Sequence, residues 1–165
     1  MTIKVGDHLP ETTFMTMGPE GPKPMTTAEV FGGRKVALFA VPGAYTPTCH
    51  KQHMPGFVDH AAALLAKGYA AVACTATNDI FVLAQWAQDT GAAGKILMLA
   101  DGSAEFAKKI GLEFDLSARG MGVRSRRYAM AVDNGVVTIL NLEAVGPGIE
   151  VSSAESLCSA IDRSL

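Results

Sequence analysis

One cysteine stands where a protein can make a thiol reactive. Cys49 lies near the end of the segment VPGAYTPTCH, residues 41–50, which follows an apolar run typical of a buried strand. Thr46 is a favoured N-cap residue and Pro47 is favoured at the first helical position, so these types predict a helix start. Cys49 is then the third helical residue, where free backbone N–H groups and the helix dipole favour a thiolate. The thiolate is the nucleophilic form of cysteine, so the segment predicts a reactive thiol; the alternative is a small thiol packed under a loop.

A helix end supplies only part of what a reactive thiol needs. Reactive cysteines have pKa values lowered from about 8.5 to 7 or below, at about 1.4 kcal/mol per unit, whereas a helix end contributes about 1 kcal/mol. A nearby cation is therefore expected, and the candidates are Arg119, Arg124, Arg126 and Arg127. Arg127 directly precedes the apolar run 128–132, so it would be partly desolvated at the mouth of a strand, where its charge acts more strongly. Arg126 is expected on a solvated loop, and Arg124 is a candidate supporting group.

The residues around Cys49 resemble a known family. Pro42, Thr46 and Cys49 stand in the Pro-x-x-x-Thr-x-x-Cys pattern of peroxiredoxins. The longer run 41–49, with HMPGF at residues 53–57, is similar to the type-five subfamily, which includes the plant type II enzymes. The resemblance extends over most of the chain. It implies a thioredoxin-like fold and a thiol-dependent peroxidase that reduces hydrogen peroxide and organic hydroperoxides without a metal or other cofactor.

The same resemblance implies roles for four residues. Cys49 would attack the peroxide and become a sulfenic acid. Arg127 matches the family arginine that stabilises the thiolate and holds the peroxide. Thr46 would hydrogen-bond the peroxide or the sulfur, a role compatible with the N-cap because a hydroxyl both donates and accepts. Pro42 has no N–H to donate and would shield the pocket from water, although it could be simple turn punctuation.

The reductant depends on the other two cysteines. Cys74 ends the apolar run 69–75, and a neighbouring parallel strand would bring it to the same sheet edge as Cys49. It is a possible resolving cysteine, as in plant type II relatives, with a buried core thiol as the alternative; Cys158 is expected in the core. Type-five members recycled through an intramolecular disulfide have a cysteine before the last helix, where this chain has IEVS at residues 149–152. We therefore expect glutathione with glutaredoxin ahead of thioredoxin.

Other functions fit the residues less well. Cys49 and His53 have the i, i+4 spacing of metal ligands, but no second Cys or His cluster accompanies them, so His53 is expected to pack in its family context. A disulfide reductase would need Cys-x-x-Cys, and Gln52 occupies that place. A non-enzymatic redox sensor that relays oxidation to a partner protein stays open as the alternative function.

Composition sets broader limits. The chain has 165 residues, 48% hydrophobic and 18% charged, which predicts one globular domain over residues 1–165. A net charge of −2 argues against nucleic acid or anionic membrane as a partner, and no apolar run approaches the roughly 18 residues of a membrane span. Three cysteines and no signal-peptide pattern favour a reducing compartment, so we expect a cytoplasmic protein. The family resemblance implies a homodimer, with a surface near Phe81 and the Cys49 segment; core packing is the alternative for Phe81 and Trp86.

Apolar periodicity predicts alternating strands and helices. Strands are expected at 12–17, 35–40, 69–75, 95–100, 128–132 and 136–142, and helices at 27–31, 49–67 (kinked at Pro55), 79–88, 103–111 and 153–163. Asn134-Gly135 between the last two strands predicts an antiparallel hairpin. This order predicts an α/β fold, with a central mixed sheet and helices on both faces.

Overall fold

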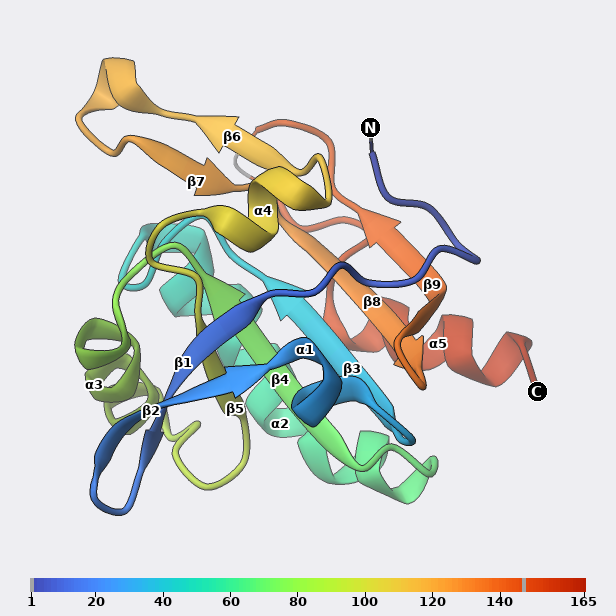
Figure 1. The fold of residues 1–165 in the computed structure, drawn as a ribbon. Coiled ribbons are helices and arrows are strands. Elements are labelled where there is room, and N and C mark those ends of the chain that lie inside the picture. Colours follow the sequence, from blue (N-terminus) through green and yellow to red (C-terminus); the bar gives the residue numbers. More distant parts are fainter. Residues whose placement is uncertain (1, 147) are drawn as a thin grey trace.

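A computed structural model describes residues 2–146 and 148–165 of the chain, and a seven-stranded sheet organises it (Figure 1). The strand order is β2-β1-β5-β4-β3-β8-β9. Its strands are β1 (Thr13–Gly18), β2 (Gly21–Thr26), β3 (Lys35–Ala40), β4 (Ala71–Ala76), β5 (Leu97–Ala100), β8 (Tyr128–Asp133) and β9 (Val136–Leu142). The helices are α1 (Thr27–Phe31), α2 (Met54–Ala66), α3 (Ile80–Thr90), α4 (Glu105–Lys109) and α5 (Ala154–Arg163).

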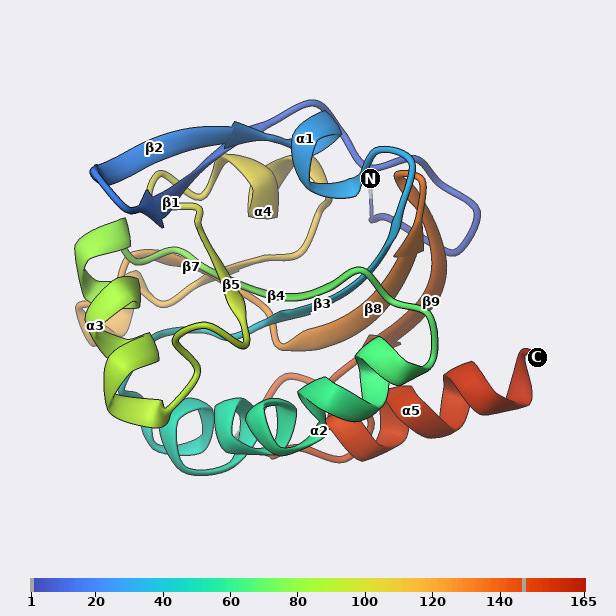
Figure 2. The ribbon, with the colours of Figure 1, turned by 90° about the horizontal axis from the view of Figure 1, so that it is seen from below.

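Helices cover both faces of the sheet. Figure 2 shows α2 and α5 below the sheet and α1 and α4 above it. Residues of α2, α3 and α5 share one apolar core with one face of the central strands, and residues of α1 and α4 share a second core with the other face. The predicted class, an α/β fold with helices on both faces, is confirmed.

The strand pairing is mixed, as predicted. The strands β3, β4 and β5 run parallel, and β8 pairs antiparallel with β3 on one side and with β9 on the other. Asn134 and Gly135 between β8 and β9 both have positive φ, 49° and 79°, which suits the tight turn that Asn-Gly predicts. Because β8 runs opposite to β3, the start of β8 meets the end of β3: Tyr128 is paired with Ala40. This pairing brings Arg127 to the sheet edge from which the Cys49 segment leaves.

Three short elements were not predicted. The strand β2 contains Pro22 and Pro24, which argue against a strand in a sheet centre, but β2 lies at the edge, where proline is tolerated. The strands β6 (Glu113–Asp115) and β7 (Val123–Ser125) form a separate two-stranded hairpin around a 3₁₀ turn at Ser117–Arg119. They project beyond the main sheet in Figure 1.

The helix after the Cys49 loop departs from regular α geometry at its start. Helical backbone begins at Pro47, as predicted, but Cys49–His53 form a π-helical turn before α2. The Met54 N–H bonds back to the Cys49 carbonyl, and Pro55 follows with no N–H to donate. A proline inside a helix disfavours the regular bond to the residue four before it, and the wider turn is one way to accommodate it. The irregularity that we expected at Pro55 thus lies just before it.

Candidate active site

The loop before Cys49 is fixed to the sheet and to its own backbone. The Val41 N–H donates to the Thr75 carbonyl of β4 (3.2 Å). Thr46 occupies the predicted N-cap place, since its carbonyl accepts from the His50 N–H at 2.8 Å. Its hydroxyl, however, donates to the Gly43 carbonyl (2.7 Å), and no backbone N–H of the described residues bonds to it. The expected hydroxyl cap is therefore replaced by a bond that tightens the loop, and the oxygen of Thr46 keeps lone pairs for another donor.

Arg127 lies against the sulfur of Cys49. The guanidinium Nη2 donates a hydrogen bond to Cys49 Sγ at 3.1 Å. Cys49 is 0% exposed and Arg127 is 8% exposed, so little solvent screens the pair. The cation predicted for Cys49 is therefore in contact with it, across 78 positions of the chain.

His53 also contacts Arg127, although no pattern in the sequence predicted it. The second guanidinium nitrogen, Nη1, lies 3.0 Å from His53 Nδ1, and His53 Nε2 lies 2.8 Å from the Ser152 carbonyl. A carbonyl only accepts, so Nε2 carries the proton and Nδ1 accepts from Arg127. Burial first, and then the charge of Arg127, lower the pKa of His53 from 6.5 to about 3, so the ring is neutral at pH 7. Cys49 and His53, at i, i+4 spacing, thus both contact the guanidinium of Arg127.

The other arginines hold backbone around the site. Arg124 donates from Nη1 to the Pro42 carbonyl (3.2 Å) and from Nε to the Met121 carbonyl (2.8 Å), so it supports the loop as suggested. Arg126 is half-buried and donates to the Glu143 carbonyl (3.0 Å), so the expectation of a solvated loop is wrong. Arg119 is exposed, at the tip of the β6–β7 hairpin.

Aromatic contacts tie the Cys49 segment to α3. Trp86 is buried and donates from its indole nitrogen to His50 Nδ1 (2.9 Å), while Tyr45 stacks on His50 and donates to Asp89 (2.6 Å). Trp86 is therefore a core residue, as one alternative stated, but Phe81 is 67% exposed and is not.

The remaining cysteines differ in burial. Cys74 is fully buried in β4, opposite Phe39, in the same core cluster as Cys49. Burial, and then the nearby Cys49, raise the pKa of Cys74 well above its ordinary value, so it is a neutral thiol at pH 7. Cys158 is half-buried on α5 and packs against that core.

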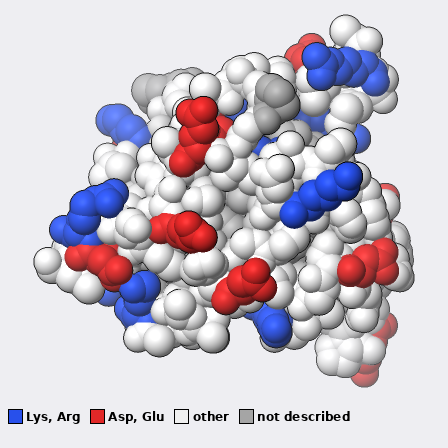
Figure 3. Space-filling view, turned by 180° about the vertical axis from the view of Figure 1, so that it is seen from behind, with Lys and Arg blue, Asp and Glu red and all other residues white. Residues whose placement is uncertain are grey.

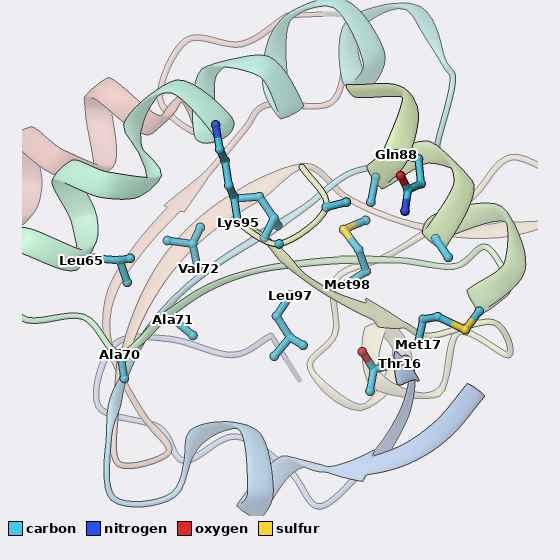
Figure 4. Close-up of a pocket in the computed structure, with 15 residues that line it drawn as sticks. Thr16, Met17, Leu65, Ala70, Ala71, Val72, Gln88, Lys95, Leu97 and Met98 are labelled. Carbon is cyan, nitrogen blue, oxygen red and sulfur yellow. The ribbon is translucent and has the colours of Figure 1, made fainter. Parts of the chain in front are cut away.

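One hollow of the surface lies away from Cys49. A pocket of about 530 Å³ opens between α3, β4 and β5 (Figure 4), and none of Cys49, Thr46, Arg127 and Pro42 lines it.

In the face seen in Figure 3, acidic and basic side chains are interspersed. Within residues 2–146 and 148–165, no three His, Cys, Asp or Glu side chains come together as a metal site would require. None of the described helices combines the length and apolarity needed to cross a bilayer.

Comparison with known proteins identifies the family. The redoxin family model matches residues 4–158 of the chain. A chloroplastic peroxiredoxin-2E-2 of rice (Oryza sativa subsp. japonica) is 48% identical, over 97% of this chain and 73% of its own, and a chloroplastic peroxiredoxin-2E of Arabidopsis thaliana is 45% identical, over 97% and 70%. The chain belongs to the redoxin family, among its plant type II-like peroxiredoxins. The peroxiredoxin is also similar to a solved structure of reduced Prx3 from Vibrio vulnificus in complex with hydrogen peroxide, with a TM-score of 0.92, 47% identity and coverage of 97% and 99% of the two chains.

These relatives establish the activity and the fold. The peroxiredoxin is a thiol peroxidase with a thioredoxin-like fold: it reduces peroxides through a cysteine sulfenic acid and draws its electrons from a thiol. The predictions of family, fold and enzyme class are confirmed, and the redox-sensor alternative gives way to them.

The predicted location of the protein is wrong. We expected a cytoplasmic protein from the cysteine count and the lack of a signal-peptide pattern. The two relatives at 48% and 45% identity are chloroplastic proteins, which contradicts that assignment. A sparse set of cysteines indicates a reducing environment, and more than one compartment provides it.

Proposed function

We propose that Cys49 is the peroxidatic nucleophile of this peroxiredoxin and that Arg127, Thr46 and Pro42 form its substrate site. The observation that carries the proposal is the 3.1 Å contact between Arg127 Nη2 and Cys49 Sγ in a buried setting. The guanidinium stabilises negative charge on the sulfur before attack. It also lies where negative charge develops on the leaving oxygen, a preorganised arrangement that costs no reorganisation during the reaction.

The step is a displacement at oxygen. The Cys49 thiolate attacks one peroxide oxygen, an S–O bond forms and the O–O bond breaks. Cys49 becomes a sulfenic acid, and the departing oxygen gains a proton to become water or an alcohol. Thr46 contributes the hydroxyl oxygen that is left free by its bond to Gly43. Pro42, held by Arg124 through its carbonyl, presents a ring without a donor and limits water at the sulfur.

Recycling proceeds, we propose, through an external thiol, glutathione with glutaredoxin ahead of thioredoxin. One thiol displaces water from the sulfenic acid and forms a mixed disulfide, and a second thiol releases the Cys49 thiolate. The burial of Cys74 and its raised pKa disfavour it as the attacking thiol, since the thiolate is the nucleophile. Cys74 as a resolving cysteine is the competing route.

Two measurements test these proposals. Cys49→Ser should abolish peroxide consumption, and Arg127→Ala should lower its rate by about a hundredfold or more, the usual loss when one preorganised donor is removed. Arg119→Ala, an exposed arginine, is the matched control. Full activity in Cys49→Ser would refute the assignment of the nucleophile.

The recycling route can be determined by intact mass. The protein is treated with one equivalent of peroxide and then with glutathione. A gain of one glutathione, unchanged in Cys74→Ser, supports the external thiol. Loss of two hydrogens, abolished by Cys74→Ser, would instead establish an internal Cys49–Cys74 disulfide.

A homodimer is proposed on the exposure of Phe81 on α3 beside the Cys49 segment. Phe81 is 67% exposed, and burying this large apolar side chain against a second copy of the chain would be favourable. Sedimentation of the wild type and of Phe81→Glu tests this: a dimer that becomes a monomer in the variant is expected, and a wild-type monomer at micromolar concentration would refute it.

A further inference from the structure

A buried carboxylate outside the proposed substrate site carries the inference. Glu143 follows β9 and is 5% exposed. Its backbone N–H donates to the Arg127 carbonyl (3.0 Å), because the end of β9 lies beside the start of β8. The carboxylate faces the loop before α5 and accepts hydrogen bonds from the Glu150 N–H (2.9 Å), the Val151 N–H (3.2 Å), the Ser152 N–H (3.0 Å) and the Ser152 hydroxyl (2.6 Å).

These bonds keep the carboxylate charged and the loop in one place. Burial raises the pKa of Glu143, but the bonds from Ser152 and its neighbours outweigh burial, and the net pKa lies below the ordinary value. Two of the four donors belong to Ser152, which is itself fully buried. The carbonyl of Ser152 is therefore held at a fixed position beside α2.

That carbonyl determines what His53 can offer to Arg127. It accepts from His53 Nε2 at 2.8 Å, which places the single proton of the neutral ring on Nε2. Nδ1 is left with a lone pair that accepts from Arg127 Nη1 at 3.0 Å. With Nη1 held in this way, the planar guanidinium presents Nη2 to Cys49 Sγ. The opposite tautomer would set an N–H of His53 against an N–H of Arg127.

We propose that Glu143 and Ser152 are positioning residues for the peroxidase chemistry, acting through the His53 tautomer to orient Arg127 against Cys49. The inference rests on the proposed roles of Cys49 and Arg127. It extends the site to a carboxylate that contacts neither the sulfur nor any atom of the substrate site named above.

The test compares two substitutions that each remove a negative charge from the segment between β9 and α5. Glu143→Gln replaces an accepting oxygen by an NH₂ group that faces backbone donors, whereas Glu150→Gln removes an exposed charge from the same loop. We expect Glu143→Gln to slow the oxidation of Cys49 by peroxide by roughly ten- to a hundredfold, as small misplacements of catalytic groups do, and Glu150→Gln to change it less than twofold. Nitrogen NMR of histidine gives a second readout: His53 should show one Nε2–H tautomer in the wild type and a mixture in Glu143→Gln.

A double-mutant cycle separates positioning from simple loop stability. His53→Asn retains an oxygen near the place of Nδ1 for Arg127 but has no group that reaches Ser152. In that background Glu143→Gln should cause almost no further loss of rate, because the path through His53 is already interrupted. Equal losses in the two backgrounds would overturn the inference, as would a single unchanged His53 tautomer in Glu143→Gln.

Failure of this inference is distinguishable from failure of the proposed function. If Cys49→Ser is inactive while Glu143→Gln keeps the wild-type rate and tautomer, only the role of Glu143 is refuted. If Glu143→Gln does not fold, Ser152→Ala removes the 2.6 Å hydroxyl bond alone and should give a smaller shift of rate and tautomer in the same direction. An unchanged rate and tautomer in that variant would count against the inference.

Discussion

The neutral, buried His53 should make the stability of the protein depend on pH. Its pKa is about 3 in the folded chain and 6.5 in the unfolded chain, where it has its ordinary value. Between these two values the unfolded chain binds a proton that the folded chain does not. Folding stability is therefore unaffected above pH 6.5, falls as the pH drops below 6.5, and continues to fall until about pH 3.

The linkage relation gives the size of the effect. Each pH unit inside the window costs about 1.4 kcal/mol of unfolding free energy. Because the transition near pH 6.5 is gradual, the loss from His53 alone between pH 7 and pH 5 is about 2 kcal/mol. A change of that size is a large part of the 5–15 kcal/mol that is typical of a folded domain.

The assay is urea unfolding at pH 7 and pH 5 for three proteins. His53→Asn cannot titrate in this range, so its loss of unfolding free energy should be smaller than that of the wild type by about 2 kcal/mol. Its absolute stability will also change, but the comparison concerns only the difference between the two pH values. His8→Gln, at an exposed histidine, should retain the wild-type difference. If the wild type and His53→Asn lose the same free energy, then His53 is not held neutral and the tautomer argument for Arg127 fails with it.

Three further predictions follow from packing and geometry. Phe57 stacks on Phe39 with ring centroids 4.0 Å apart and is fully buried, so Phe57→Ala should lower the unfolding free energy by about 3–5 kcal/mol, measured by urea unfolding, whereas Leu65→Ala on the exposed face of α2 should change it little. A Cβ at Gly43 would lie 2.8 Å from Arg124 Nη1, so Gly43→Ala should displace Arg124 from the Pro42 carbonyl and slow peroxide turnover while leaving the melting temperature within a few degrees; an unchanged rate would contradict this. The Ser153 hydroxyl caps α5 by accepting from the Ser156 N–H, so Ser153→Ala should cost about 1 kcal/mol in the same unfolding assay, and Ser153→Asp should restore most of it.

Local sequence signals were sufficient for the elements that position Cys49. The order Thr-Pro-x-Cys after an apolar strand predicts the helix start because capping and proline preferences act within a few residues. Arg127 was predicted as the partner of Cys49 because a reactive thiol was expected to need a second cation and this arginine directly precedes the apolar run 128–132. The hairpin at Asn134-Gly135 was predicted from local signals too, because a two-residue turn requires positive φ at residues such as Asn and Gly.

The parts that were missed depend on pairings between distant segments. His53 contacts Arg127 across 74 positions and Ser152 across 99, so no spacing in the sequence joins them. Glu143 reads as the end of a strand, and its burial becomes visible only when the loop before α5 folds over it. A weak signal existed in Ser152, a small polar residue before the capping Ser153, but it does not distinguish a helix start from a partner of His53.

The surroundings of Cys49 and Cys74 also bear on how the oxidised enzyme is recycled. Arg127 donates to the sulfur of Cys49 at 3.1 Å, whereas burial and then the nearby Cys49 raise the pKa of Cys74 well above its ordinary value. The π-helical turn at residues 49–53 is held in place by the contacts of His50 with Trp86 and of His53 with Ser152. Cys49 is 0% exposed, so an external thiol also needs this segment to open before it can reach the sulfur. If these contacts oppose an internal disulfide, loosening them through Glu143→Gln should increase the share of Cys49–Cys74 disulfide seen by intact mass.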